Sequence, residues 1–368
     1  MFRGKKVSKL LEKEKEKEKE TKTKTEKFLV IRMLNSGDVC AIALPVLRNF
    51  QKNHPDAEIH FLTFGDGAEI IKLAEPSVYV HHITEEQWSD DFFLAMESFL
   101  GLAEDIIGEN YVQIVNLDTT FMPCFLARFL ADAGDPVSGN YLNMSVQQLL
   151  QQVQDQSLQA DYVNSTQAFM ASSFVNMHKW FGPWWQFDAE YEGGYPEFYL
   201  TKCCGLVVDK LDQGIVVIPD KKLAKKAKSN KVIGLCFGQS DDGYLYPYVS
   251  RLKKLLEQKG FAVWSDSDAR GDIRSLLKML KSSDLMLCKP SGNRWYAQAV
   301  ECPTLLITGD SEPALLMPEF ATDPMSPCMQ HAVNENNFGT LGCNCDETED
   351  LVESIESIFV HLEEQNHA

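Results

Sequence analysis

The chain has 368 residues, 44% of them hydrophobic and 10% aromatic, which is enough apolar material for a substantial core and for two domains. Its net charge is −18, and because residues 1–27 hold eleven Lys or Arg and six Glu, the remainder carries −23. A body this acidic argues against binding to nucleic acid or to anionic lipid. No apolar run reaches the ~18 residues that span a bilayer, and the N-terminus is charged where a signal peptide would be apolar, so we expect a cytoplasmic protein that is not transmembrane. Ten cysteines without regular spacing are typical of a reducing compartment.

Residues 1–27 are dominated by the run LEKEKEKEKETKTKTEK. Strict alternation of Glu and Lys leaves no apolar face at helical spacing, so this stretch predicts a charged tail that is disordered or partly helical. Contact of the tail with a membrane or a partner is the less favoured alternative.

The first α/β unit begins with an apolar strand at residues 28–33, continues through a turn at residues 35–38 and enters an apolar helix at residues 39–50. Such a turn leaves backbone N–H groups and a polar side chain at the carboxyl end of the sheet, where open α/β folds bind ligands. Asp38 fits two roles there. Spacing alone favours a cap on the helix that begins at Val39, whereas an ionised carboxylate could instead take a proton from an incoming hydroxyl.

Further units follow in order. Strands are predicted at residues 58–63, 78–83 and 111–117, and helices at residues 68–73, 91–101 and 123–133. Strands that alternate with helices indicate parallel order and right-handed crossovers. Asp118 comes directly after the strand at 111–117, where it could either line a cleft or cap a turn.

Residues 134–200 are less regular, with a Gln-rich helix at residues 144–159 and a cluster of aromatic residues around Gly and Pro after it. Aromatic rings beside polar groups suit stacking on a sugar ring. The candidates for binding a sugar, which would be the acceptor in a transfer reaction, are Trp180, Trp184, Trp185 and Tyr195. An oligomer interface or a flap over the core explains the same residues equally well.

A basic linker at residues 211–230 leads into a second α/β block, with strands at residues 231–237, 261–265 and 285–288. The third strand runs into the sequence KPSGNRW. A Ser-Gly turn that opens a helix presents N–H groups to a diphosphate. The candidate diphosphate contacts here are Ser291, Gly292 and Asn293, flanked by Lys289 and Arg294. No GxGxxG follows any strand, which argues against a nicotinamide-dependent oxidoreductase.

Four segments together resemble the heptosyltransferase family, the ADP-heptose glycosyltransferases of the GT-B type. They are the strand and turn with NSGDV and LPVLR, the strand end YVQIVNLDTT, the turn GQSDDGYLYP and the stretch KPSGNRWYAQAVECPTLLITGDSEP. The resemblance covers approximately residues 28–130 and 231–320. It implies an α/β fold of two facing Rossmann-like domains with parallel sheets and an interdomain cleft. The expected division is a charged tail (1–27), an acceptor-side domain (28–210), a linker (211–230), a nucleotide-sugar-binding domain (231–345) and a C-terminal helix (346–368) that returns to the first domain.

The resemblance also implies roles for individual residues. Asp38 matches the general base of the family. The donor would be bound by Gly37, Gly238, Gln239, Ser240 and Tyr244, together with the Ser-Gly turn and its flanking cations. Tyr244 stands where family members have a lysine near the diphosphate, and a tyrosine can donate a hydrogen bond but cannot neutralise charge.

The form of the Ser-Gly turn is nearest to the branch that attaches heptose to bacterial autotransporter proteins, because Pro290 and Trp295 replace an aspartate and a histidine of other members. That branch has a polypeptide acceptor, which suits the acidic body, and carries a cysteine-bound iron. Its counterpart here would be a structural iron or zinc held by Cys328, His331, Cys343 and Cys345. A chance cluster of free cysteines is the competing interpretation.

Two functions follow. The first is an inverting glycosyltransferase, independent of metal, that moves heptose from ADP-heptose to a hydroxyl on a glycan or protein, in a chain that is expected to form homo-oligomers. The alternative is a catalytically degenerate relative that acts as a binding or assembly subunit, which would explain Tyr244, Pro290 and Trp295 together.

Overall fold

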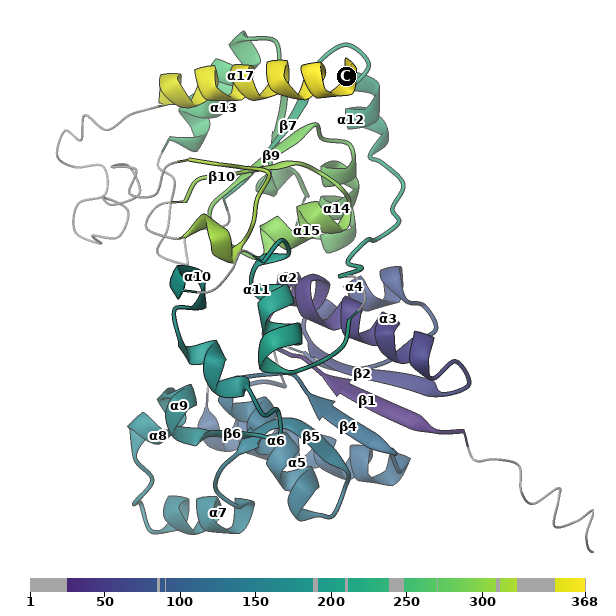
Figure 1. The fold of residues 1–368 in the computed structure, drawn as a ribbon, viewed down its shortest axis with the longest axis vertical. Coiled ribbons are helices and arrows are strands. Elements are labelled where there is room, and N and C mark those ends of the chain that lie inside the picture. The colour runs from purple at the N-terminus through teal and green to yellow at the C-terminus, as the bar shows by residue number, and fades with distance from the viewer. Residues whose placement is uncertain are drawn as a thin grey trace, which may run out of the picture.

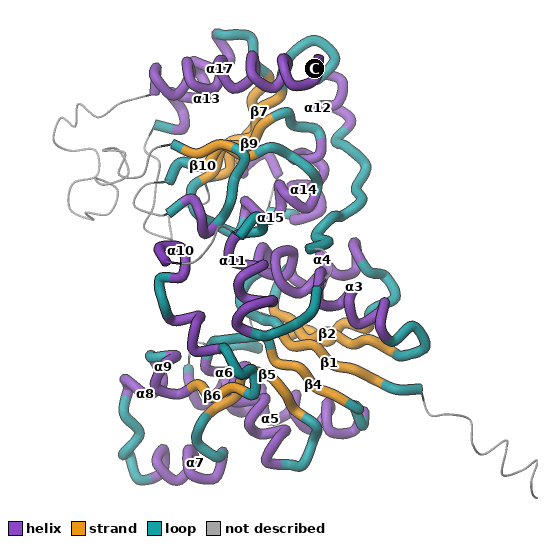
Figure 2. Tube along the Cα trace, viewed as in Figure 1, coloured by secondary structure: helices purple, strands orange, loops and turns teal. Residues whose placement is uncertain are grey.

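The computed structural model describes residues 25–84, 87–89, 91–187, 191–208, 211–237, 248–269, 271–308, 312–322 and 348–367. These residues form two lobes, each built around its own sheet (Figure 1). Strands and helices alternate through most of both lobes, as Figure 2 shows. The predicted α/β fold with two parallel-dominated sheets is therefore confirmed.

The N-terminal lobe contains a six-stranded sheet in the order β3-β2-β1-β4-β5-β6. All neighbouring strands pair in parallel except β5 and β6, which are antiparallel. The strands are β1 (Lys27–Ile31), β2 (Glu58–Phe64), β3 (Tyr79–Ile83), β4 (Gln113–Asn116), β5 (Val137–Leu142) and β6 (Met170–Ser172). The central strand β1 has no exposed side chain, as expected of a parallel strand covered on both faces.

Helices cover both faces of this sheet, and several begin at a side-chain cap. Asp91 caps α5 by accepting hydrogen bonds from two backbone N–H groups, and Ser145 forms a capping box with Gln148 at α7. The helices of the lobe are α2 (Ser36–Asp38), α3 (Leu44–Asn53), α4 (Gly67–Ala74), α5 (Phe92–Glu109), α6 (Phe121–Asp132), α7 (Val146–Gln154), α8 (Ala160–Asn164) and α9 (Thr166–Phe169).

The chain then runs along the interface between the lobes through α10 (Trp184–Phe187) and α11 (Gly194–Glu197), and α11 continues as a π-helical turn at Phe198–Cys203. We call residues 191–208 the bridging segment. In Figure 1 it lies between the two sheets, next to α2.

The C-terminal lobe contains a parallel sheet in the order β11-β10-β9-β7-β8. Its strands are β7 (Val232–Cys236), β8 (Ala262–Ser265), β9 (Leu285–Cys288), β10 (Thr304–Leu306) and β11 (Phe320–Ala321), and its helices are α12 (Lys221–Lys226), α13 (Val249–Gln258), α14 (Ile273–Lys281), α15 (Asn293–Ala299) and α17 (Thr348–His367). Among the described helices, none is both long and apolar enough to cross a bilayer.

The final helix corrects one expectation. We expected it to return to the first lobe, but α17 packs along α13 on the C-terminal lobe (Figure 1). Its apolar side chains Leu351, Val352, Ile355 and Phe359 join the core of that lobe. An ion pair between Lys259 and Glu356 lies at the edge of this contact. The apolar face of α17 is thus buried against the C-terminal lobe, and this burial holds the helix there.

The two lobes share one apolar cluster, which extends from Phe28 and Val39 in the first lobe to Trp264 and Trp295 in the second. A side-chain contact crosses the boundary as well, since Arg274 Nε donates to a carboxylate oxygen of Glu69 at 3.3 Å. The lobes therefore meet in packed contact.

A cluster of two histidines and a tyrosine lies at the amino end of the first sheet. His60 Nδ1 is 3.2 Å from His81 Nε2, and the Tyr111 hydroxyl is 2.8 Å from the first nitrogen and 3.0 Å from the second. Burial lowers the pKa of both histidines, with a further contribution from Lys27 at His60 and from His60 at His81. The folded protein therefore favours the neutral imidazoles.

The cluster predicts a pH-dependent stability. A lowered pKa means that the unfolded chain binds protons more readily than the folded protein. The stability of the folded protein is therefore fully present above pH ~6.5, and it decreases as the pH falls below that value. The free energy of unfolding should fall by at most about 1.4 kcal/mol per pH unit for each histidine. The effect at His81 should be smaller because that side chain is partly exposed. Urea unfolding between pH 5 and 7.5 measures it. A His60→Gln/His81→Gln variant should have a flatter profile, and His82→Gln, at an exposed neighbouring position, should not.

Candidate active site

Asp38 lies at the carboxyl end of β1, inside the turn that the sequence singles out. Asn35 caps α2 within this turn. Its side-chain oxygen accepts a hydrogen bond of 2.9 Å from the Asp38 N–H. The capping role that spacing favoured for Asp38 is therefore wrong, since Asn35 performs it and Asp38 makes no side-chain cap. This leaves the carboxylate available for other contacts.

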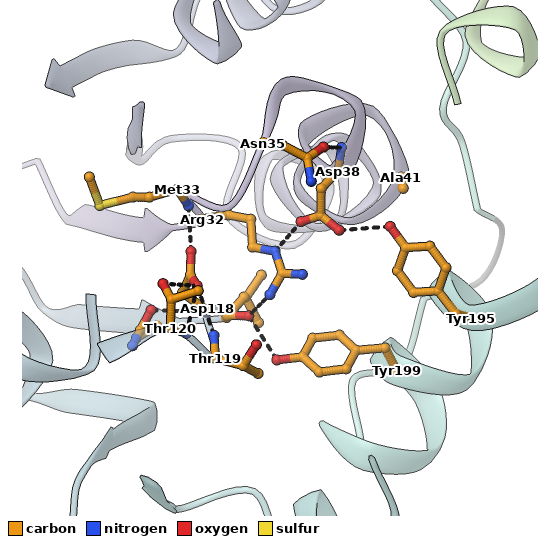
Figure 3. Close-up of polar contacts among 12 residues, drawn as sticks. Arg32, Met33, Asn35, Asp38, Ala41, Asp118, Thr119, Thr120, Tyr195 and Tyr199 are labelled. Carbon is orange, nitrogen blue, oxygen red and sulfur yellow. Dashed lines mark hydrogen bonds and ion pairs between the residues drawn. The ribbon is translucent and has the colours of Figure 1, made fainter. Parts of the chain in front are cut away.

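Two side chains hold that carboxylate, one at each oxygen (Figure 3). Arg32 Nε donates to Oδ2, and the Tyr195 hydroxyl donates to Oδ1 at 2.7 Å. The Asp38 side chain is only 3% exposed. A carboxylate oxygen has two lone pairs, so each oxygen can still accept one more hydrogen bond from a ligand.

Arg32 is the cation that compensates this buried charge. Its guanidinium also donates through Nη1 to the Leu117 carbonyl and lies 5.2 Å from the centre of the Tyr199 ring. Burial opposes the charged form, but attraction to Asp38 and Tyr199 outweighs it, so the pKa of Arg32 is raised well above its ordinary value. The arginine is therefore permanently charged and holds an ion pair in the wall of the site.

A cavity of about 410 Å³ lies against this ion pair, between the lobes. That size is within the range of small-molecule sites. Its walls come from both lobes and from the bridging segment. The lining residues are Arg32, Leu34, Asn35, Asp38, Thr119, Trp180, Tyr195, Pro290, Ser291, Gly292, Trp295, Glu312, Leu315 and Leu316.

The Ser-Gly turn of the second lobe meets the first lobe at this cavity. A Cβ atom built on Gly37 would lie 2.5 Å from the Gly292 Cα, so the two glycine backbones touch and Gly37 has no room for a side chain. The Ser36 hydroxyl is hydrogen-bonded to the Tyr296 hydroxyl beside them. Ser291 Oγ is buried and has no hydrogen-bond partner among the described residues. The structure thus brings Asp38, Ser291 and Gly292 together, as the sequence predicted, and places Gly37 at the contact.

The predicted aromatic residues divide into two groups. Trp180 and Tyr195 line the cavity, with their rings 6.1 Å apart. Trp184 does not, because it stacks on Phe198 at 4.4 Å within the core, and Trp185 packs edge-on against Trp184. Acceptor binding through Trp184 or Trp185 is therefore not supported, and the core-flap interpretation describes these two residues.

Asp118 also has a structural role. It is fully buried, and one oxygen accepts hydrogen bonds from the Thr119 and Thr120 N–H groups and the Thr120 hydroxyl. The other oxygen accepts the Met33 N–H at 2.6 Å. The acceptor-binding prediction for Asp118 is wrong, and its alternative, a turn cap, is correct, because this carboxylate replaces the backbone partners that the two strand ends lack (Figure 3).

Three predicted donor contacts around the Ser-Gly turn do not line the cavity. Arg294 is 2% exposed and donates to the Met317 carbonyl at 2.8 Å, away from the cavity wall. Asn293 donates to the Cys236 carbonyl at 3.2 Å and so ties the turn to β7. Lys289 is buried and also lies outside the cavity wall. None of the three contacts the cavity in this arrangement.

Several predicted residues lie outside the described residues. These are the donor-loop residues Gly238, Gln239, Ser240 and Tyr244 and the metal candidates Cys328, His331, Cys343 and Cys345. Within the described ranges, no group of three or more His, Cys, Asp or Glu is arranged to hold a metal ion. Seven described cysteines are buried free thiols.

Sequence reasoning missed the partners of Asp38. Arg32 carried a signal, because a lone charge directly after a buried apolar strand must find a counter-ion. Asn35, three residues before Asp38, was a recognisable cap. Nothing in the sequence pointed to the contact between Tyr195 and Asp38, which are far apart in the chain.

Two parallel-dominated sheets in separate lobes, with a cavity between them at the strand ends, define the GT-B fold of glycosyltransferases. By sequence, the chain matches no protein-family model and no curated protein. Solved structures do resemble it. A family 9 glycosyltransferase from Veillonella parvula aligns with a TM-score of 0.58 at 12% identity, over 91% of this chain and 97% of that one.

The heptosyltransferase WaaC from E. coli, solved with ADP, aligns with a TM-score of 0.51 at 13% identity, over 89% of this chain and 99% of WaaC. The iron-containing dodecameric glycosyltransferase TibC from enterotoxigenic E. coli aligns with a TM-score of only 0.41, at 12% identity, over 87% of this chain and 64% of TibC. The first two similarities confirm the fold that the sequence resemblance implied. At such low identity the activity has to be argued from the site.

Proposed function

We propose that this protein is an inverting glycosyltransferase that moves a heptose from ADP-heptose to a hydroxyl acceptor. The observation that carries the proposal is the position of Asp38, a buried carboxylate in the wall of the interlobe cavity that also includes the Ser291–Gly292 turn. The chemistry needs a base on one side of a sugar and a diphosphate site on the other, and the cavity offers one group from each lobe. The structural relatives named above are glycosyltransferases.

In the proposed reaction, the acceptor hydroxyl gives its proton to Asp38 while its oxygen attacks the anomeric carbon. The bond between that carbon and the diphosphate oxygen breaks, and its electron pair leaves with ADP. Attack from the side opposite the leaving group inverts the anomeric configuration. Holding both substrates in line lowers the entropic part of the barrier, and Asp38 supplies general-base catalysis.

The donor diphosphate would lie at the turn, where Ser291 Oγ offers an unused donor and Gly292 allows close approach of the backbone. We also assign donor contacts to Gly238, Gln239, Ser240 and Tyr244. Trp180 is the remaining aromatic candidate for stacking on the acceptor. The acidic body suits a polypeptide acceptor better than a phosphorylated glycan, and we propose a cytoplasmic location and a homo-oligomer.

A second function is a catalytically degenerate relative that binds or assembles without transfer. One observation favours it: both Asp38 oxygens already accept a hydrogen bond, one from Arg32 and one from Tyr195. Binding without turnover would support this alternative.

Titration calorimetry with ADP-heptose, ADP and a UDP-sugar tests the proposal. We expect micromolar binding of ADP-heptose and ADP and weaker binding of the UDP-sugar. Ser291→Ala should weaken binding of both adenine ligands about ten-fold or more, because a hydrogen bond to a charged phosphate is lost. Ser354→Ala, which removes an exposed hydroxyl on α17, is the matched control and should bind normally. Failure of every nucleotide to bind would rule out the proposed donor site.

A further inference from the structure

Tyr195, in the bridging segment, holds one of the two oxygens of Asp38. Its hydroxyl donates to Asp38 Oδ1 at 2.7 Å, while Arg32 donates to the opposite oxygen (Figure 3). The Tyr195 side chain is partly buried and lines the cavity. Two donors on opposite oxygens, one from each side, fix the rotation of the carboxylate about its Cβ–Cγ bond.

The helix that carries Tyr195 rests on the C-terminal lobe. Gly194 begins α11 with a φ of +63°, and a Cβ atom there would lie 2.6 Å from the Leu315 carbonyl oxygen. The Tyr195 ring then packs edge-on against Trp295, with centroids 5.2 Å apart and planes at 82°. Trp295 belongs to α15, the helix that follows the Ser291–Gly292 turn. The position of Tyr195 therefore depends on the same helix that forms the proposed donor site.

One turn further along, the same segment is anchored to the N-terminal lobe. The Tyr199 hydroxyl donates to the Leu117 carbonyl at 2.7 Å, and its ring lies against the Arg32 guanidinium. Tyr195 and Tyr199 thus face the same ion pair from neighbouring turns of one segment, but of these two only Tyr195 contacts the Asp38 carboxylate (Figure 3). The bridging segment links Asp38 to both lobes.

We infer that Tyr195 is a positioning residue that orients the Asp38 carboxylate and makes that orientation depend on the contact between the C-terminal lobe and α11. The inference rests on the proposed glycosyltransferase function. Burial and the neighbouring carboxylate raise the pKa of Tyr195 well above its ordinary value, so the phenol stays protonated and donates throughout the working pH range. Without this donor the carboxylate is free to rotate toward Arg32, away from the acceptor.

The test compares wild type, Tyr195→Phe and Tyr199→Phe. The assay follows release of ADP from ADP-heptose with water as acceptor, so it needs no identified acceptor, and donor binding is measured separately by calorimetry. Tyr195→Phe should lower kcat about ten- to hundred-fold while the Kd for ADP-heptose changes less than about two-fold, because one orienting hydrogen bond to a charged group is lost.

Tyr199→Phe is the matched control, because it removes a buried phenol from the next turn without touching Asp38. It should keep kcat within about three-fold of wild type. Equal losses in the two variants, or an unchanged kcat in Tyr195→Phe, would overturn the inference. Failure of the proposed function has a different signature, because wild type itself would then release no ADP.

Discussion

Replacing Asp38 by asparagine is expected to abolish transfer while donor binding persists. The asparagine amide would match the carboxylate in shape but could not accept a proton, so kcat should fall by about 10²- to 10⁴-fold, the usual contribution of a general base. The donor site on the second lobe does not include this side chain's charge, so the Kd for ADP-heptose should change little. Release of ADP and transfer of heptose, both at saturating donor, measure the effect.

Two further variants keep this test interpretable. Asp212→Asn removes an exposed carboxylate paired with Arg48 and should retain full activity. Asp38→Glu keeps the charge but displaces it, and should lose less activity than Asp38→Asn while remaining folded. Unchanged turnover in Asp38→Asn would remove Asp38 from the mechanism, whereas loss of donor binding would place it in the donor site instead.

Arg32→Met should cause a large loss of stability. Removing one partner of a buried ion pair leaves the other charge uncompensated, at a cost of about 3–5 kcal/mol in the free energy of unfolding. The pair with Asp38 meets that condition, since the two side chains are 2% and 3% exposed. Urea unfolding at pH 7 measures the difference.

The matched control is Arg128→Met, which breaks an exposed pair with Asp132 and should cost less than about 1 kcal/mol. The double variant Arg32→Met/Asp38→Asn should recover much of the lost stability, because no charge is then left buried without a partner. If Arg32→Met were no more destabilising than Arg128→Met, the ion pair would not be the stabilising contact that its burial indicates.

The fold was predictable because its signals are local. Alternating apolar strands and helices, with small-residue turns after them, specify parallel sheets whose carboxyl ends collect polar groups. Asp38 and the Ser291–Gly292 turn were identified on that basis, and both line the cavity. Short-range rules also explain the Asn35 cap, although Asp38 is equally suited to a cap by spacing alone.

The two-sheet α/β architecture and the turns that line the cavity could be predicted, because they follow from periodicity and turn chemistry over a few residues. Which polar groups already have a partner became clear only from the packing of distant segments. The Asp118 carboxylate accepts hydrogen bonds from backbone N–H groups, and Trp184 stacks within the core. The Asp38 carboxylate accepts hydrogen bonds from Arg32 and Tyr195. Such partnerships depend on which distant segments pack together, and a buried polar group takes whichever partner that packing supplies.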